Sequence, residues 1–117
     1  MGLIAVRIAE DFPWQTPADS WPGKVAADQP QVKFRTLCEG SANLPDLRLV
    51  QYEPGHFEAA HSHDVTEVLY ILQGELDFGG ETVRAGSAIV IEKNTTYGPL
   101  TAGAEGTEFL RVAGFGG

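Results

Sequence analysis

The stretch from Gly55 to Gly74, GHFEAAHSHDVTEVLYILQG, contains side chains whose types and spacing can bind a metal ion. His61 and His63 are two residues apart, and in a β-strand such side chains point to the same face of the sheet. Glu67 follows a short polar break, so a turn at that break would bring its carboxylate back to the histidines. Two imidazoles and one carboxylate form the ligand set that holds non-haem iron while leaving coordination positions open.

The spacing resembles the first conserved motif of the cupin superfamily. Gly55, His61, His63, Glu67 and Gly74 match its signature positions. The resemblance implies an all-β fold, a cupin jelly-roll β-barrel also called a double-stranded β-helix. It also implies one divalent metal ion per chain, held by His61, His63 and Glu67. It does not specify a reaction, because this barrel hosts many functions.

The second cupin motif, which usually supplies a further histidine ligand, is matched less well. Gly86 begins it, but Glu92, Asn94 and Tyr97 stand where the pattern has proline, glycine and histidine. Asn94 can adopt the left-handed backbone that glycine usually supplies. Tyr97 has three interpretations: a phenolate ligand, a catalytic hydrogen-bond donor to substrate or to metal-bound water, or an aromatic side chain that plugs the barrel mouth.

Two other chemically capable residues have simpler interpretations. His56 has the opposite strand parity to His61, so we expect a partly buried side chain with a hydrogen-bond partner, turned away from the site. Cys38 is the only cysteine and lies in a strand-like run, which favours a small buried side chain over a nucleophile.

The rest of the chain alternates strand-like runs with turn signals. No segment of ten or more residues keeps a helical apolar period, which predicts an all-β sandwich or barrel. Gly79-Gly80 is the strongest hairpin signal. The predicted strands cover residues 32–37, 47–52, 68–72, 76–78, 82–84, 88–91 and 108–112.

The N-terminal part differs in composition. Residues 3–8 form a short β-branched run, which predicts an edge strand. Residues 11–23 contain both tryptophans and three prolines, and the prolines exclude a helix or a central strand. We therefore divide one structural domain into an arm, 1–23, and a barrel, 24–117. Trp14 and Trp21 either cover an open end of the core or bury against a second subunit. An edge strand exposes unpaired backbone groups, and small cupins commonly pair such strands, so a homodimer is expected.

Other residues are candidates for a substrate pocket. In the barrel that the resemblance implies, inward positions come from residues 68–72, 88–91 and 108–112. Arg111 could anchor a substrate carboxylate, or could be an exposed strand arginine. Tyr52 and Phe34 are assigned to the core. The pocket candidates are Tyr70, Gln73, Phe109 and Arg111.

Composition limits the class of partner. The chain of 117 residues has eight basic and sixteen acidic residues, a net charge of −8, which repels nucleic acid and anionic membranes. The start of the chain does not resemble a signal peptide, and no segment is apolar enough to span a membrane, so we expect a cytoplasmic protein.

These observations favour a mononuclear metalloenzyme of dioxygenase, isomerase or lyase type that acts on a small organic molecule. Iron or manganese suits the ligands best, while nickel or zinc is chemically acceptable. The alternative is a non-catalytic module that binds or senses a small molecule. Burying two histidines and a glutamate without a cation would cost desolvation energy, which argues against a metal-free form.

Overall fold

The structure is a computed structural model that describes residues 2–16 and 32–114. Within these ranges the only helical element is one 3-10 turn, so the all-β prediction is confirmed. The described residues include no helix that is long and apolar enough to cross a membrane. The elements are η1 (Ala9–Asp11), β1 (Val32–Cys38), β2 (Asp46–Tyr52), β3 (Phe57–Glu58), β4 (Glu67–Phe78), β5 (Glu81–Arg84), β6 (Ala88–Ile91) and β7 (Leu100–Ala113).

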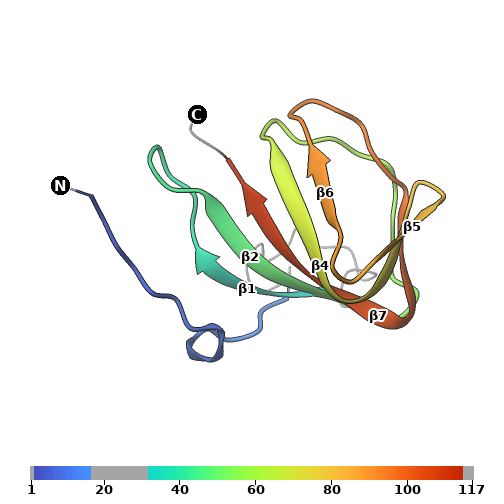
Figure 1. The fold of residues 1–117 in the computed structure, drawn as a ribbon, viewed down its shortest axis with the longest axis horizontal. Helices are drawn as coiled ribbons and strands as arrows, with labels where there is room; N and C mark the ends of the chain where they lie inside the picture. Colours follow the sequence, from blue (N-terminus) through green and yellow to red (C-terminus); the bar gives the residue numbers. More distant parts are fainter. Residues whose placement is uncertain (1, 17–31, 115–117) are drawn as a thin grey trace.

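The strands form one antiparallel sheet in the order β1-β2-β7-β4-β5, with β3 added to β7 and β6 added to β4 (Figure 1). The predicted hairpin at Gly79-Gly80 joins β4 to β5, with Phe78 paired to Glu81. Two predicted strands, 68–72 and 76–78, are parts of the single strand β4, and 108–112 is the end of β7. These long strands let the sheet curve around a core.

The curve depends on a close approach of β4 and β7. The register between them shifts twice, on either side of Gly74. Gly74 has a φ of +77°, and a Cβ there would clash with the carbonyl oxygen of Gly106. Glycine is therefore required for conformation and for space.

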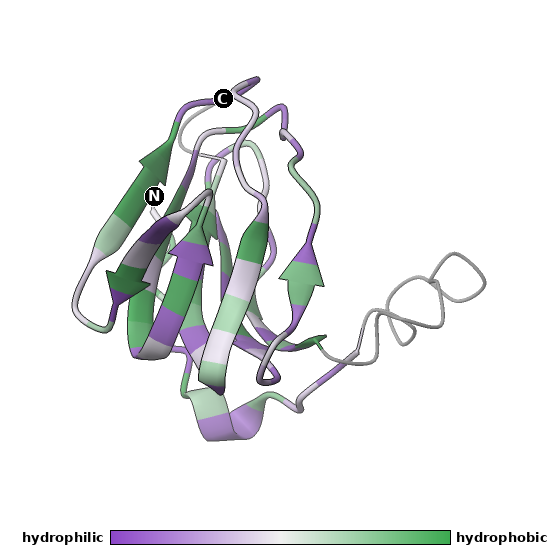
Figure 2. Ribbon diagram, turned by 90° about the vertical axis from the view of Figure 1, so that its right-hand side faces the viewer, coloured by the Kyte–Doolittle hydropathy of each residue, from purple (hydrophilic) through white to green (hydrophobic). Residues whose placement is uncertain are grey.

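The inner face of the sheet carries the core. Along β4, Glu67, Leu69 and Ile71 are buried, while Tyr70 and Leu72 are exposed on the outer face. Figure 2 shows the resulting alternation of apolar and polar bands along the strands. Both aromatic residues assigned to the core, Phe34 and Tyr52, are buried in the apolar cluster at the inner face.

The N-terminal segment differs from its prediction. Residues 3–8 form no strand in the single chain, and Ile4 and Val6 are 93% and 83% exposed. One side-chain contact ties the segment down, because Arg7 Nε donates to the carbonyl of Leu37 at 2.7 Å. An edge strand needs a neighbouring backbone to pair with, and the described part of this chain offers none at that place. The proposed boundary between residues 23 and 24, like Trp21, lies outside the described residues.

Trp14 does lie within the described part of the chain. The Arg35 guanidinium stands 4.5 Å from the centre of the Trp14 ring, and Gln15 forms a bridge with Phe34 of β1. Arg35 pairs with Leu49 on the outer face of the sheet, so Trp14 covers the edge of that face.

Candidate metal and substrate site

Backbone pairing brings the two motifs together. His61 and Tyr97 form an isolated bridge in which the N–H of each donates to the carbonyl of the other, at 3.0 and 2.9 Å. Asn94 has a φ of +61°, as its sequence position suggested, and its N–H donates to the carbonyl of His63 at 2.7 Å. Residues about thirty positions apart in sequence therefore share one end of the barrel.

The side chains at this end form an aromatic group. The ring centres of His61 and His63 are 5.0 Å apart, and those of His61 and Tyr97 are 4.7 Å apart. His61 Nδ1 lies 2.8 Å from the carbonyl oxygen of Ala59. Because a carbonyl can only accept, Nδ1 carries the proton, and in neutral His61 the Nε2 lone pair stays available for a ligand.

Glu67 is the buried centre of the group, with 1% of its surface exposed. The Tyr97 hydroxyl donates to Oε1 at 2.6 Å, and Arg111 Nε donates to Oε2 at 2.6 Å. The expectation that this carboxylate would lack a compensating cation without metal is therefore wrong. Arg111 supplies that positive charge from 44 residues away in sequence.

Tyr97 is a neutral donor in this arrangement. Burial raises the pKa of its phenol well above the ordinary value, and the hydrogen bond to Glu67 raises it further. Phe78 stacks against the ring at 5.6 Å with an interplanar angle of 10°. Tyr97 therefore donates to the Glu67 carboxylate, and its side chain is also buried in the core cluster, as the aromatic-plug interpretation expects. A role of its hydroxyl toward a substrate or a metal ion stays a prediction.

The donor types at this end fit a divalent metal ion, but they are not gathered around one point. Among the residues that the structure describes, no three His, Cys, Asp or Glu side chains are placed to hold a metal together. His63 Nε2 is 3.9 Å from Glu67 Oε1. Two ligands at about 2.1 Å from one ion are separated by at most about 4.2 Å, so this pair can share an ion. Each Glu67 oxygen retains a second lone pair for such an ion.

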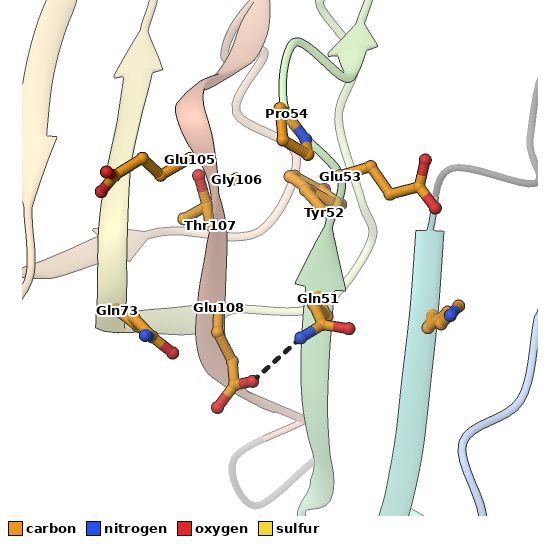
Figure 3. A pocket seen from close by; sticks show the side chains of 10 residues that line it. Gln51, Tyr52, Glu53, Pro54, Gln73, Glu105, Gly106, Thr107 and Glu108 are labelled. Atoms are coloured by element: carbon orange, nitrogen blue, oxygen red, sulfur yellow. Dashed lines mark hydrogen bonds between the residues drawn. The ribbon is translucent and has the colours of Figure 1, made fainter.

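The other pocket candidates are scattered. Tyr70 is 42% exposed on the outer face, so the prediction that it faces inward is wrong. Gln73 is also exposed, beyond a register shift of β4, and lines a separate pocket of about 330 Å³ (Figure 3). That pocket lies beside Gln51, whose side chain donates to Glu108 at 3.5 Å. Phe109 belongs to the core.

Arg111 projects from the inner face of β7 toward Glu67 and is not an exposed arginine: 22% of its side chain is accessible. Its neighbours Asp46 and Arg48 were not among the sequence candidates. Arg48 donates to both oxygens of Asp46, at 2.9 and 3.3 Å, and Arg111 Nη1 is 3.5 Å from Asp46 Oδ1. Strand parity could have identified Arg48 from the sequence, because in a strand it shares a face with Val50 and the core residue Tyr52.

A second polar group lies in the interior. His56 is 1% exposed, with Nε2 3.2 Å from Glu58 Oε1 and its ring 4.5 Å from that of Tyr52. Burial raises the pKa of Tyr52 well above its ordinary value, and the nearby Glu58 carboxylate raises it further. His56 is thus buried and partnered, and it belongs to a different group from His61 and His63.

Comparison with known families agrees with this architecture. The family model described as "Cupin domain" matches residues 48–113, more than half of the chain. The chain belongs to the cupin family. No curated protein sequence matches it.

Solved cupin-like structures share its fold over most of their length. KdgF from Halomonas sp. has a TM-score of 0.72 at 16% identity, with 95% of this chain and 93% of that chain covered. The polyketide cyclase RemF from Streptomyces resistomycificus has a TM-score of 0.71 at 20% identity, covering 95% and 79%. A sugar phosphate isomerase from Silicibacter pomeroyi has a TM-score of 0.73 at 15% identity, covering 93% and 74%. At these identities the likeness establishes the jelly-roll fold and leaves the reaction open.

Proposed function

We propose that this cupin is a mononuclear metalloenzyme acting on a small organic molecule, with His61, His63 and Glu67 as metal ligands. The observation that carries the proposal is the placement of His63 Nε2 3.9 Å from the buried Glu67 carboxylate, beside a His61 ring whose Nδ1 contact with Ala59 leaves the Nε2 lone pair for a ligand. Iron or manganese suits these donors, and nickel or zinc is the alternative. Such an ion supplies Lewis-acid polarisation of a substrate oxygen, or dioxygen activation where it is iron.

The chain's own residues would then hold and orient the substrate. Tyr97 presents a neutral hydroxyl next to Glu67, so a small shift of that hydroxyl would let it donate to a substrate oxygen instead. Arg111 fixes the carboxylate plane of Glu67 through Oε2, which leaves Oε1 to Tyr97 and on the side of His63. Among solved neighbours, a polyketide cyclase and a sugar phosphate isomerase make isomerase or lyase chemistry a reasonable first screen.

The alternative is a non-catalytic module that binds a small molecule. The specific observation in its favour is that Tyr97 and Arg111 already satisfy both oxygens of Glu67. Because Arg111 already compensates the Glu67 carboxylate, the pocket does not need a metal ion to balance that charge, and a metal-free binding role is chemically consistent.

Metal content measured by plasma mass spectrometry on untagged protein separates these functions. The metalloenzyme predicts about one metal per chain, lost in His61→Ala and in His63→Ala while circular dichroism stays unchanged. The third histidine provides the control, because His56→Gln should keep the metal if the variant folds. If wild-type protein contains no metal and takes up none of iron, manganese, nickel or zinc, the metalloenzyme is ruled out and the binding module stands.

A further inference from the structure

Two arginines face one another on the inner face of the sheet. Arg48 of β2 and Arg111 of β7 are direct register partners, and both side chains lie on the face that carries the core. Like charges directly opposite each other in a sheet are destabilising. Asp46 offsets this repulsion by binding Arg48 through both oxygens while lying 3.5 Å from Arg111 Nη1.

The guanidinium groups retain unused donors. Each guanidinium has five N–H groups. Arg48 uses Nε and Nη2 on Asp46, and Arg111 uses Nε on Glu67 with one long contact to Asp46. Within the described residues, Arg48 Nη1 and Arg111 Nη2 have no partner. Because 26% and 22% of these side chains remain exposed, the unused donors are accessible to a small solute.

A bound divalent metal ion would make the local charge favour an anion. Two arginines balance Asp46 and Glu67, so the cluster is neutral although the chain carries a net charge of −8. A divalent ion at His61, His63 and Glu67 would leave an excess of about two positive charges next to these donors. A ligand with one or two negative charges would neutralise that excess.

We propose that Arg48 and Arg111 form a carboxylate-binding subsite, so that the small molecule bound by this protein is an organic acid. The inference rests on the proposed metal site for the position of the reacting group and for the excess positive charge, whereas the hydrogen bonds to the carboxylate come from the two arginines. Asp46 already occupies Nε and Nη2 of Arg48, so a substrate carboxylate would be held by the remaining donors, Arg48 Nη1 and Arg111 Nη2. Arg111 would share its donors between Glu67 and the ligand.

Titration calorimetry with small probes tests this at constant chloride concentration and about neutral pH. Malonate and succinate are compared with malonamide and succinamide, which have similar shapes and no charge, and with inorganic phosphate. Wild-type protein should bind the carboxylates and neither amide. Arg48→Gln and Arg111→Gln should each weaken binding by about tenfold to a hundredfold, the range expected for a charge-assisted hydrogen bond.

Two further variants keep the result interpretable. Arg84→Gln removes the same charge from β5, where Arg84 forms an exposed pair with Glu75 of β4, and this variant should bind the probes as wild type does. Arg111→Lys keeps the charge but loses the planar fork, so it should bind more weakly than wild type even where Arg111→Gln is unstable. Carboxylate binding that is unchanged in Arg48→Gln and Arg111→Lys would overturn the subsite, as would preference for phosphate or no binding at all.

Chelator-treated and metal-loaded protein are titrated in parallel, and metal content is measured on each. Arginine-dependent carboxylate binding in metal-free protein would support the subsite even if the metal proposal fails. A bound metal together with arginine-independent carboxylate binding would keep the metal proposal and refute the subsite.

Discussion

Glu67 has two competing sets of partners, and this competition defines the residue-scale chemistry. Arg111 and Tyr97 hold its oxygens at 2.6 Å, while His63 lies farther away at 3.9 Å. A cation at the histidines must therefore share a carboxylate that already has a cationic partner. The sharing orients Glu67 and at the same time weakens its attraction for a metal.

The Glu67–Arg111 pair should respond asymmetrically to mutation. Arg111→Met leaves a carboxylate that is 1% exposed without its cation, so we expect a loss of about 3–5 kcal/mol in the free energy of unfolding. Glu67→Gln leaves an arginine that is still close to Asp46 and partly solvated, so the loss should be smaller. Urea unfolding measures both, and the double variant Glu67→Leu with Arg111→Met should recover much of the loss. Equal losses in the two single variants would contradict the predicted asymmetry.

The buried phenol of Tyr52 predicts a pH dependence in the alkaline range. Its pKa is raised in the folded protein, so the stabilisation is complete below the unfolded value of about 10 and is lost as the pH rises above it. The free energy of unfolding of the wild type should thus decrease more steeply above about pH 10 than that of Tyr52→Phe. Urea titrations at several alkaline pH values test this, and parallel curves for the two proteins would contradict it.

At the scale of the elements, the site depends on the pairing of β4 with β7. β4 carries Glu67 at its start and Gly74 in its middle, and β7 carries Arg111 near its end. The start of β4 pairs with the end of β7 in continuous register, before the two shifts around Gly74, and places Arg111 opposite Leu69 on the face that Glu67 shares. The pairing of Glu67 with Arg111 is therefore a consequence of strand register.

Alanine variants of two motif glycines with the same backbone conformation would distinguish the cost of backbone strain from the cost of a steric clash. Gly55 and Gly74 have φ values of +76° and +77°, but a Cβ at Gly55 meets nothing within 4 Å, whereas one at Gly74 would clash with Gly106. Gly55→Ala should cost about 1–2 kcal/mol for the left-handed backbone alone. Gly74→Ala should cost clearly more, because β4 and β7 must separate. Equal unfolding midpoints for the two variants would refute the close-approach explanation.

At the scale of the whole molecule, apolar surface remains uncovered. The N-terminal segment exposes Ile4 and Val6, and the outer face of the sheet exposes further large apolar side chains. Across β6, β4, β7 and β2 the register aligns two outer rows that are almost wholly apolar. These rows are Val90, Val68, Val112 and Leu47, and Ala88, Tyr70, Leu110 and Leu49.

We expect a homodimer in which this outer face or the N-terminal segment is covered by a second copy. Sedimentation velocity should give twice the mass of 12.6 kDa. Val90→Glu should shift the protein toward monomer, while Thr82→Glu, an exposed change in the β4–β5 hairpin, should not. Because each chain carries −8, added salt should strengthen the association. A wild-type protein that stays monomeric at high concentration would show that these surfaces have another role.

The sequence by itself determined the features that depend on local chemistry. Strand alternation placed Phe34 and Tyr52 in the core, Gly79-Gly80 formed the hairpin, and Asn94 adopted the left-handed turn. The motif spacing also indicated the cupin family, which the match over residues 48–113 confirms. Such signals act within a few residues, so they can be read along the chain.

Only the tertiary structure decided which distant groups meet. The partner of Glu67 lies 44 positions away, and its identity depends on the register of curved strands. Arg48 faces Arg111 for the same reason. Tyr70 is different, because its place three residues after Glu67 in the same strand already directs it to the opposite face. The N-terminal residues formed no strand, since strand formation requires a pairing partner that composition cannot reveal. Side-chain type and spacing thus define candidate ligands, while strand register determines which charges compensate them.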